Sequence, residues 1–302
     1  MRVELAPHLT LSRPVIAAAG CFGFGETVSD LADASALGAL VTPTITKSAR
    51  PGNPMPRTAE TAAGLLHSLG MPNPGLDAFL SEALPALRRL PCPAIVSLRG
   101  ESEAEWSELA RALYGGGVKA LELNLSVLSL DGEPAILKAI GAAVRSARRA
   151  GAGPLIAKLP AANVEIGAAA RAAVDAGADA VAVSQAFPGV AVRLSSRRFR
   201  LPGISGELSG PCIKPLALYQ VWRVAQTVKC PIIGSGGIMT AEDAVEFLIA
   251  GALAVGVGIA SSIHPTAISN IAAGIHQYLR DEQIAAVSAL TRAGHAALAG
   301  SS

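Results

Sequence analysis

The segment Lys119-Ala-Leu-Glu-Leu-Asn-Leu-Ser-Val-Leu-Ser129 combines an apolar strand pattern with side chains that could line a reactive site. Removal of a proton from a substrate carbon would need a positioned base in such a site. Asn124 and Ser126 offer hydrogen-bonding groups. Val127 has no titratable group, so it cannot be that base.

Two glycine-rich segments could bind a phosphate group. Gly234-Ser-Gly-Gly237 follows an apolar run and leads toward a helical pattern, and Gly256-Val-Gly258 ends another apolar run. Unhindered glycine amides can approach a phosphate closely, and a helix N-terminus favours negative charge. The alternative is that these glycines only form tight turns.

Lys158 is a second candidate for anion binding. It lies in Leu155-Ile-Ala-Lys-Leu159, a run so apolar that an unpaired ammonium group would be costly to bury. We therefore expect an anion beside it. The alternatives are that Lys158 reaches solvent at the end of a strand or pairs with an internal acid such as Glu122.

The scaffold for these residues is predicted by the apolar runs of the chain. Short aliphatic runs alternate with amphipathic stretches, which is typical of parallel strands joined by crossover helices. The runs are nearly all apolar, as strands buried on both faces are. We expect an α/β fold in which these strands close a single (β/α)8 TIM barrel. The predicted strands are residues 15–19, 39–45, 94–98, 120–125, 155–159, 180–184, 232–234 and 254–257.

Two helix starts and two long connections can also be located. Ser102-Glu-Ala-Glu105 predicts a capping box, and Thr240-Ala-Glu-Asp243 predicts a Thr cap with acids in the first turn. Residues 46–75 and 186–215 are too long for plain turns, and both connect a strand to the next helix. In such barrels this side holds the active site.

Length and charge limit the classes of protein and partner. The 302 residues, 51% hydrophobic and 4% aromatic, fit one domain over 1–302 with an aliphatic core, because α/β barrels often use about 250 residues or more as a unit. After Asp281 we expect a last helix and, from about residue 283, a frayed tail. A net charge of +2 gives no argument for nucleic acid or a membrane surface.

The cysteines and the N-terminus predict the compartment. Cys21, Cys92, Cys212 and Cys230 are scattered without a C-x-x-C pair, which predicts reduced thiols rather than a zinc site or disulfides. The N-terminus has an acid early and no apolar run of signal length, and no later segment reaches about 18 uninterrupted apolar residues. We expect a cytoplasmic protein with no metal site.

Five further motifs occur in a fixed order along the chain. They are Ala19-Gly-Cys-Phe-Gly-Phe-Gly25, Gly52-Asn-Pro-Met-Pro-Arg57, Leu69-Gly-Met-Pro-Asn-Pro-Gly75, Leu208-Ser-Gly-Pro-Cys-Ile-Lys-Pro215 and Pro231-Ile-Ile-Gly-Ser-Gly-Gly-Ile-Met-Thr-Ala-Glu-Asp243. With Glu122-Leu-Asn124, this set resembles the dihydroorotate dehydrogenase family, class 1, especially type 1B. The resemblance runs from about residue 5 to about residue 265. It implies an FMN-binding barrel, a homodimer and, as a partner, an iron–sulfur/flavin electron-transfer subunit.

The resemblance also implies positions for the cofactor. The FMN phosphate would lie near Gly236, Gly237 and Gly258. Lys158 matches the lysine at the pyrimidine edge of the flavin, where positive charge stabilises the reduced ring. Asn124 matches another polar residue near the flavin, although it could equally be a simple hydrogen-bonding residue inside the barrel. The other implied cofactor residues are Ala19, Gly20 and Gly210.

The chain departs from the family at several cofactor and catalytic positions. The family segment normally runs Glu-Leu-Asn-x-Ser-Cys-Pro-Asn, so Val127 occupies the place of the catalytic cysteine. Relative to the family, Pro43 replaces a lysine near the flavin, and Ser97 replaces an asparagine. Ile259 replaces a threonine or serine. We expect weakened FMN binding. Lys47 could reach back toward the flavin, or be a solvated loop lysine.

The substrate positions are changed as well. Four family asparagines clamp the planar dihydroorotate, and here His67, Ser129 and Gln185 hold three of these positions beside Asn124. Ala186 replaces a Thr or Ser. Because the hydrogen-bonding pattern differs, orotate would leave buried donors and acceptors unpaired.

The missing base could be replaced by His67, Ser129 or Asp131. His67 is the first choice, because a histidine titrates nearest neutral pH. Alternatively, it fills the space of the lost asparagine and bonds to the backbone. The basic run Arg193-Leu-Ser-Ser-Arg-Arg-Phe-Arg200 is either a solvated face or a site for an acidic substrate or partner.

Three hypotheses for the function remain. The first is an FMN-dependent oxidoreductase of this family that acts on a different small substrate. The second is a ligand-binding protein or partner subunit that has lost redox chemistry. The third is a genuine dihydroorotate dehydrogenase with an unrecognised base.

Overall fold

A closed barrel of eight strands forms the centre of the computed structural model, which describes residues 1–26, 34–125, 132–291 and 293–295. The strand order is β10-β15-β16-β3-β4-β7-β8-β9, and neighbouring strands are parallel. The predicted α/β TIM barrel is confirmed, with a strand inside each of the predicted ranges or within one residue of it. The barrel strands are β3 (Val15–Ala17), β4 (Ala39–Val41), β7 (Ala94–Leu98), β8 (Ala120–Asn124), β9 (Leu155–Lys158), β10 (Ala180–Val183), β15 (Ile232–Ser235) and β16 (Ala254–Val257).

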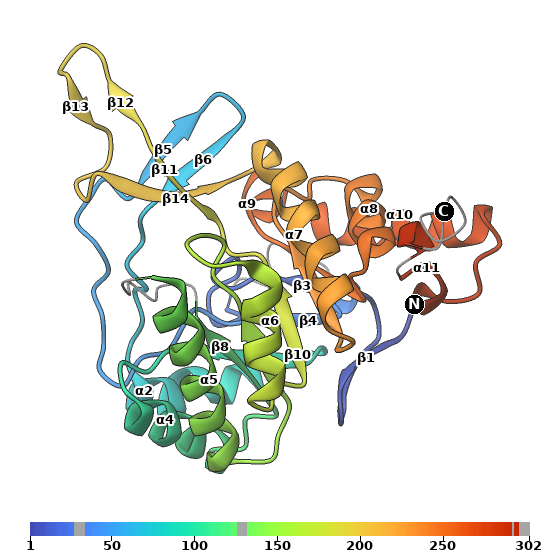
Figure 1. Cartoon of the computed structure of the whole chain (residues 1–302), viewed down its shortest axis with the longest axis horizontal. Helices are drawn as coiled ribbons and strands as arrows, with labels where there is room; N and C mark the ends of the chain where they lie inside the picture. The colour runs from blue at the N-terminus through green and yellow to red at the C-terminus, as the bar shows by residue number, and fades with distance from the viewer. Residues whose placement is uncertain (27–33, 126–131, 292, 296–302) are drawn as a thin grey trace.

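Helices surround this barrel (Figure 1). Their inner faces follow the helical period: α5 buries Ile136, Ile140 and Val144, which are four residues apart. The helices are α2 (Leu76–Ala78), α3 (Leu84–Leu87), α4 (Glu103–Gly115), α5 (Glu133–Ala150), α6 (Ile166–Asp175), α7 (Lys214–Thr227), α8 (Ala241–Ala250), α9 (Ile259–Ile263), α10 (Ala267–Asp281) and α11 (Val287–Leu290), with a π-helical turn η2 (Phe79–Ala83) and 3₁₀ turns η1 (Ala34–Ala36) and η3 (Pro211–Ile213). None of the described helices is long and apolar enough to cross a membrane.

The two predicted helix caps differ in detail. At α8, Thr240 and Asp243 form a complete capping box. At α4, the Ser102 side chain accepts from the amide of Glu105, as predicted, but the Glu105 carboxylate accepts from the amide of Glu101 at 2.9 Å. The reciprocal bond of the predicted box is therefore displaced by one residue.

The two long connections are not plain loops. They supply the strands of a four-stranded antiparallel sheet in the order β11-β14-β6-β5, which we call the cap sheet. β5 and β11 alternate between half-buried and exposed residues, β6 and β14 are mostly half-buried, and the cap sheet lies above the barrel (Figure 1). The pairing of β6 with β14 joins the connection after β4 to the connection after β10. The strands are β5 (Thr58–Thr61), β6 (Gly64–His67), β11 (Phe187–Val190) and β14 (Ser205–Ser209).

Two small hairpins complete the strands. β1 (Val3–Ala6) pairs with β2 (Leu9–Leu11) just before the barrel begins, and buries Leu5 and Leu11. β12 (Val192–Arg193) pairs with β13 (Arg198–Phe199) in an arm that projects beyond the cap sheet (Figure 1). The arm is exposed along its whole length, so it adds little to the core.

Candidate active site

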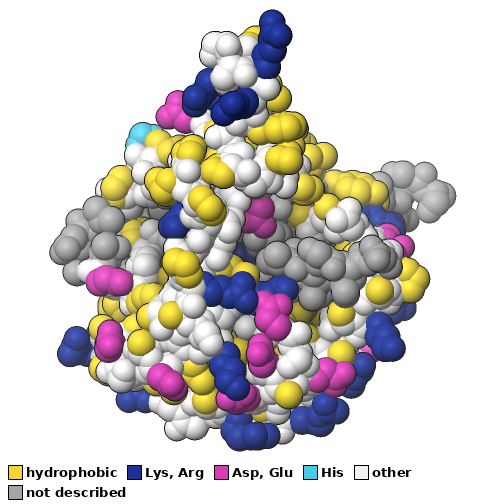
Figure 2. Space-filling model, turned by 90° about the vertical axis from the view of Figure 1, so that its left-hand side faces the viewer, with side chains coloured by type: hydrophobic (Ala, Val, Ile, Leu, Met, Phe, Trp, Pro, Cys, Tyr) yellow, Lys and Arg dark blue, Asp and Glu magenta, His cyan; other side chains and the backbone are white. Residues whose placement is uncertain are grey.

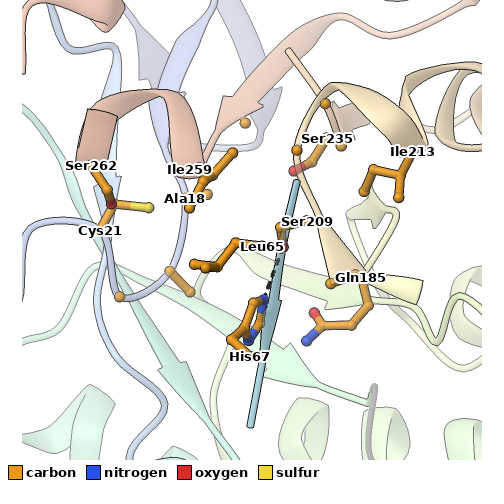
Figure 3. A pocket seen from close by; sticks show the side chains of 18 of the residues that line it. Ala18, Cys21, Leu65, His67, Gln185, Ser209, Ile213, Ser235, Ile259 and Ser262 are labelled. Atoms are coloured by element: carbon orange, nitrogen blue, oxygen red, sulfur yellow. Dashed lines mark hydrogen bonds between the residues drawn. The ribbon is translucent and has the colours of Figure 1, made fainter. Parts of the chain in front are cut away.

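A cavity of about 260 Å³ lies between the carboxyl ends of the barrel strands and the cap sheet (Figure 3). Segments that follow five barrel strands reach it, together with side chains of the cap sheet. This is the end of a TIM barrel where active sites are found. The lining residues include Ala19, Gly20, Lys158, Gly210, Gly236, Gly237 and Gly258 of the predicted cofactor site, and His67 and Gln185 of the predicted substrate site.

At one end of the cavity the wall is made by glycine backbone. Gly236 and Gly237 have φ of 126° and 74°, which side chains rarely adopt. A Cβ atom on Gly237 would lie 2.8 Å from both the Gly210 carbonyl oxygen and the Lys214 amide nitrogen. The turn after β15 therefore requires glycine for its contact with the start of α7, as well as for any contact with a ligand.

Two other glycines leave open space on the cavity side. A Cβ atom on Gly20 would have no heavy atom within 4 Å, and one on Gly258 would only reach the Ala18 side chain at 4.0 Å. Side chains at these positions would fill the cavity. The glycine wall therefore fits a phosphate group that must approach the backbone closely. Of the two alternatives for the glycines, the tight turn accounts for Gly237 but not for Gly258.

Lys158 lies at the end of β9 and lines the same cavity. Its ammonium group has no hydrogen bond or ion pair with any described residue, so the suggested pairing with Glu122 is not formed. Glu122 itself is 4% exposed, and its Oε1 atom lacks a hydrogen-bond partner within the described residues. A half-buried cation without a partner among the described residues fits an anionic or electron-rich ligand, such as the edge of a flavin ring.

Asn124 is placed differently from the other predicted site residues. It pairs in register with Lys158 but is buried, and its amide donates to Thr44 Oγ1 at 2.8 Å. Thr44 in turn lies 3.1 Å from Ser97 Oγ. Asn124 is not among the described cavity-lining residues. Its geometry corresponds to the simpler expectation of a hydrogen-bonding residue inside the barrel.

The opposite end of the cavity is formed by ionisable side chains of the cap sheet. His67 Nε2 lies 2.9 Å from Ser209 Oγ, and His67 Nδ1 lies 3.8 Å from Glu207 Oε2 (Figure 3). Gln185 donates to Glu207 Oε1 at 3.1 Å. Burial lowers the pKa of His67, and Lys158 lowers it further, while Glu207 opposes both. The pKa of His67 therefore lies below its ordinary value, and the ring is bonded to a side chain, not to the backbone as in the alternative.

Several predicted residues lie elsewhere. Val127, Ser129 and Asp131 are outside the described residues. Lys47 is exposed and pairs with Glu108 at 2.8 Å, so it is a solvated loop lysine. Ile259 lines the cavity as expected, and Ser262 on the same helix supplies a hydroxyl group to that wall.

The basic run forms the exposed arm of β12 and β13. Figure 2 shows its arginine side chains at the apex of the molecule, and none of residues 191–200 lines the cavity. Arg200 donates to the Glu60 carbonyl oxygen at 2.7 Å, which ties the base of the arm to β5. The run therefore does not contact a ligand in the cavity, and the solvated face remains the simpler interpretation.

Sequence reasoning missed Ser209 and Glu207. Ser209 lies inside the motif Leu208-Ser-Gly-Pro, so its position was visible although its role was not. Glu207 belongs to none of the motifs identified in the sequence. Glu207 and Ser209 are two residues apart on β14, so their side chains lie on the same face of the cap sheet. His67 of β6 lies on that face as well. Prediction of this strand pair would have revealed the cluster.

Comparisons with known proteins agree with this architecture. The family model "Dihydroorotate dehydrogenase" matches residues 3–279. The chain is 42% identical over 295 residues to the dihydroorotate dehydrogenase B (NAD(+)) catalytic subunit of Desulforudis audaxviator, covering 95% of each chain. It is 40% identical over 292 residues to the catalytic subunit of Geobacter sulfurreducens, again covering 95% of each. The crystal structure of dihydroorotate dehydrogenase from Eimeria tenella in complex with ferulenol superposes with a TM-score of 0.80 at 20% identity, covering 97% of this chain and 88% of that one.

Proposed function

This chain belongs to the dihydroorotate dehydrogenase family, and we propose that it is an FMN-dependent oxidoreductase whose small substrate is not dihydroorotate. The family membership supports the FMN chemistry. The changed substrate is supported by the cap end of the cavity, where an ionisable cluster stands in place of an amide clamp. We take residues 1–302 as one functional domain.

The residues present fit FMN. The glycine wall of Gly236, Gly237 and Gly258 would hold its phosphate, and Lys158 would lie at the edge of the ring. Bound there, FMN would supply the hydride acceptor. Ala19, Gly20 and Gly210 complete the wall. Pro43 and Ile259 provide no cation and no hydroxyl, so we expect weaker binding than in relatives.

The observation that supports a changed substrate best is the contact of His67 with Ser209 and Glu207. An asparagine at position 67 could donate and accept through its amide, whereas this imidazole is held by side chains of β14. Val127 removes the base of the family, and His67 supplies an acid–base group on the cavity wall. Together with Gln185, these changes should exclude orotate, because each unmatched buried polar group costs about 1–3 kcal/mol.

Two measurements test this proposal. An absorption band at about 450 nm in the purified protein, or after incubation with FMN, would show a bound flavin. Titration calorimetry with orotate should then detect no binding in the micromolar range. Micromolar orotate affinity would mean that the substitutions preserve the family's substrate site, and absence of flavin after prolonged incubation would favour a ligand-binding protein without redox chemistry.

A second candidate is dihydroorotate oxidation itself, with an unrecognised base. It is supported by the names of the relatives that are 40–42% identical over nearly the full length. The word "subunit" in those names also supports a partner for this chain, for which an iron–sulfur/flavin electron-transfer subunit is the family's expectation. Steady turnover of dihydroorotate by the pure protein with an artificial acceptor would favour this candidate.

A further inference from the structure

On the cap side of the cavity, a serine hydroxyl group, a histidine ring and a carboxylate lie next to one another in space. Ser209 Oγ lies 2.9 Å from His67 Nε2, and Glu207 Oε2 lies 3.8 Å from His67 Nδ1. Both ring nitrogens of His67 therefore face a partner. Ser209 and His67 line the cavity (Figure 3), whereas Glu207 is not among the described lining residues.

Strand pairing explains why these residues meet. His67 of β6 is the register partner of Glu207 of β14, so their side chains lie on the same face of the cap sheet. Ser209 is two residues further along β14 and shares that face. Gln185 follows β10 and holds the second carboxylate oxygen of Glu207 at 3.1 Å. The cluster is thus fixed from three separate segments of the chain.

The protonation state of His67 suits proton transfer from Ser209. Burial is the main reason why the pKa of His67 is lowered, and the Lys158 charge acts in the same direction. A neutral imidazole has one donor and one acceptor nitrogen. Glu207 Oε2 lies 3.8 Å from Nδ1, so the tautomer with its hydrogen on Nδ1 directs that hydrogen toward the carboxylate and leaves Nε2 to accept from the Ser209 hydroxyl group.

We propose that Ser209 is the proton-accepting group of this site, that His67 takes the Ser209 proton, and that Glu207 and Gln185 position His67. This proposal rests on the proposed oxidoreductase function. Ser209 lines the cavity, and its oxygen keeps lone pairs while the hydroxyl group donates to His67, so it can face a substrate. It would supply the acid–base group that Val127 cannot.

The proton step is balanced within these residues. The substrate C–H proton forms a new O–H bond with Ser209 while the original hydroxyl proton moves to His67 Nε2. The electron pair of the broken C–H bond enters the new carbon–carbon double bond. FMN, when bound, would supply the acceptor for the hydride of the adjacent carbon. The imidazolium that forms is stabilised by Glu207, whose carboxylate is already oriented toward it.

The reactivity of Ser209 can be measured without knowing the substrate. Diisopropyl fluorophosphate reacts with activated serines: the serine oxygen bonds to phosphorus, fluoride leaves, and the proton passes to the neighbouring base. We expect covalent labelling of Ser209, located by peptide mass spectrometry. Labelling should be lost in Ser209→Ala and slowed about 10²- to 10⁴-fold in His67→Gln. Ser205→Ala, on the exposed start of the same strand, is the matched control and should label normally.

Glu207 requires a readout that a merely structural role would not change. The labelling rate should rise with pH as His67 loses its proton. In Glu207→Gln the half-maximal pH should shift downward, because the carboxylate that raises the His67 pKa is gone. Titration of the His67 ring by NMR should show the same shift.

The outcomes separate this proposal from the proposed function. Labelling that depends on His67, in a protein that binds no flavin, would support the activated serine and remove the redox function. Flavin binding without Ser209 labelling, or labelling that His67→Gln does not slow, would overturn the serine proposal and leave the oxidoreductase standing. An unshifted pH profile in Glu207→Gln would overturn the positioning role of Glu207.

Discussion

The two ends of the cavity are built from different parts of the chain. The phosphate end is made of backbone: Gly236, Gly237 and Gly258 follow barrel strands that the barrel itself fixes. The cap end is made of side chains from β6 and β14, which meet only through the cap sheet. Backbone geometry can persist while side chains change. This difference would explain how the chain could retain a cofactor wall and alter its chemistry at the other end, as we propose.

The largest effect should be seen with dihydroorotate. If the cap end has changed its chemistry, turnover should be lower than in an active family member by about 10²- to 10⁴-fold, the contribution of a general base. Val127→Cys alone should not restore it, because His67 and Gln185 still present the wrong hydrogen-bonding groups. A dye-linked assay of Val127→Cys beside Val127→Cys/His67→Asn/Gln185→Asn would check this. If Val127→Cys alone restored turnover of dihydroorotate, the loss of that activity would be due to Val127 alone.

At the phosphate end, two glycines form a matched pair. Both have positive φ, 74° at Gly237 and 85° at Gly20, but only Gly237 is crowded by backbone atoms. Gly237→Ala should lower the free energy of unfolding by about 3 kcal/mol, and Gly20→Ala by about 1 kcal/mol, the cost of backbone strain alone. Urea denaturation measures both. Equal losses would mean that the turn after β15 relaxes around a side chain.

The cap end should respond to pH in a known direction. Since the pKa of His67 in the folded protein lies below its ordinary value of 6.5, the unfolded chain binds the proton more readily. The stabilisation is complete above about pH 6.5 and is lost as pH falls toward the folded pKa, with a slope of at most about 1.4 kcal/mol per pH unit. Urea melts of wild type and His67→Gln between pH 5 and pH 8 would isolate this contribution. Parallel profiles would assign the pH dependence to other groups.

The smallest effect concerns the helix that follows the glycine turn. Thr240→Ala removes the capping box of α8 and should cost about 1 kcal/mol of stability. If backbone glycines alone form the phosphate end, the affinity for FMN should stay the same. Fluorescence titration with FMN tests this separation. A weaker affinity would show that the cap of α8 also shapes the phosphate wall.

The barrel could be predicted from the sequence because its strands are buried on both faces. Such strands appear as continuous apolar runs, and β10 and β16 are buried at every residue. The cap strands are half-buried, and β11 contains Pro188 and Gly189, which indicate a loop in a sequence pattern. These strands were therefore expected as long connections.

The same physical difference separates the predicted site residues from the missed ones. Gly237 and Lys158 lie at the ends of barrel strands, so their convergence followed from the fold. Glu207 meets His67 only because β14 and β6 pair in one register, and local sequence contains no information about that register. For Asn124 the sequence left two alternatives, and its bond to Thr44 corresponds to the simpler one.

The bond between His67 and Ser209 joins residues that are 142 positions apart in the chain. Contacts between such distant residues form slowly during folding, because a large loop must close before the contact stabilises anything. Six of the eight barrel strands lie between or before these two residues, so most of the scaffold can form first. The reactive cluster is then assembled among the last parts of the molecule. A nascent or partly folded chain in which β6 and β14 have not paired would hold His67 and Ser209 apart.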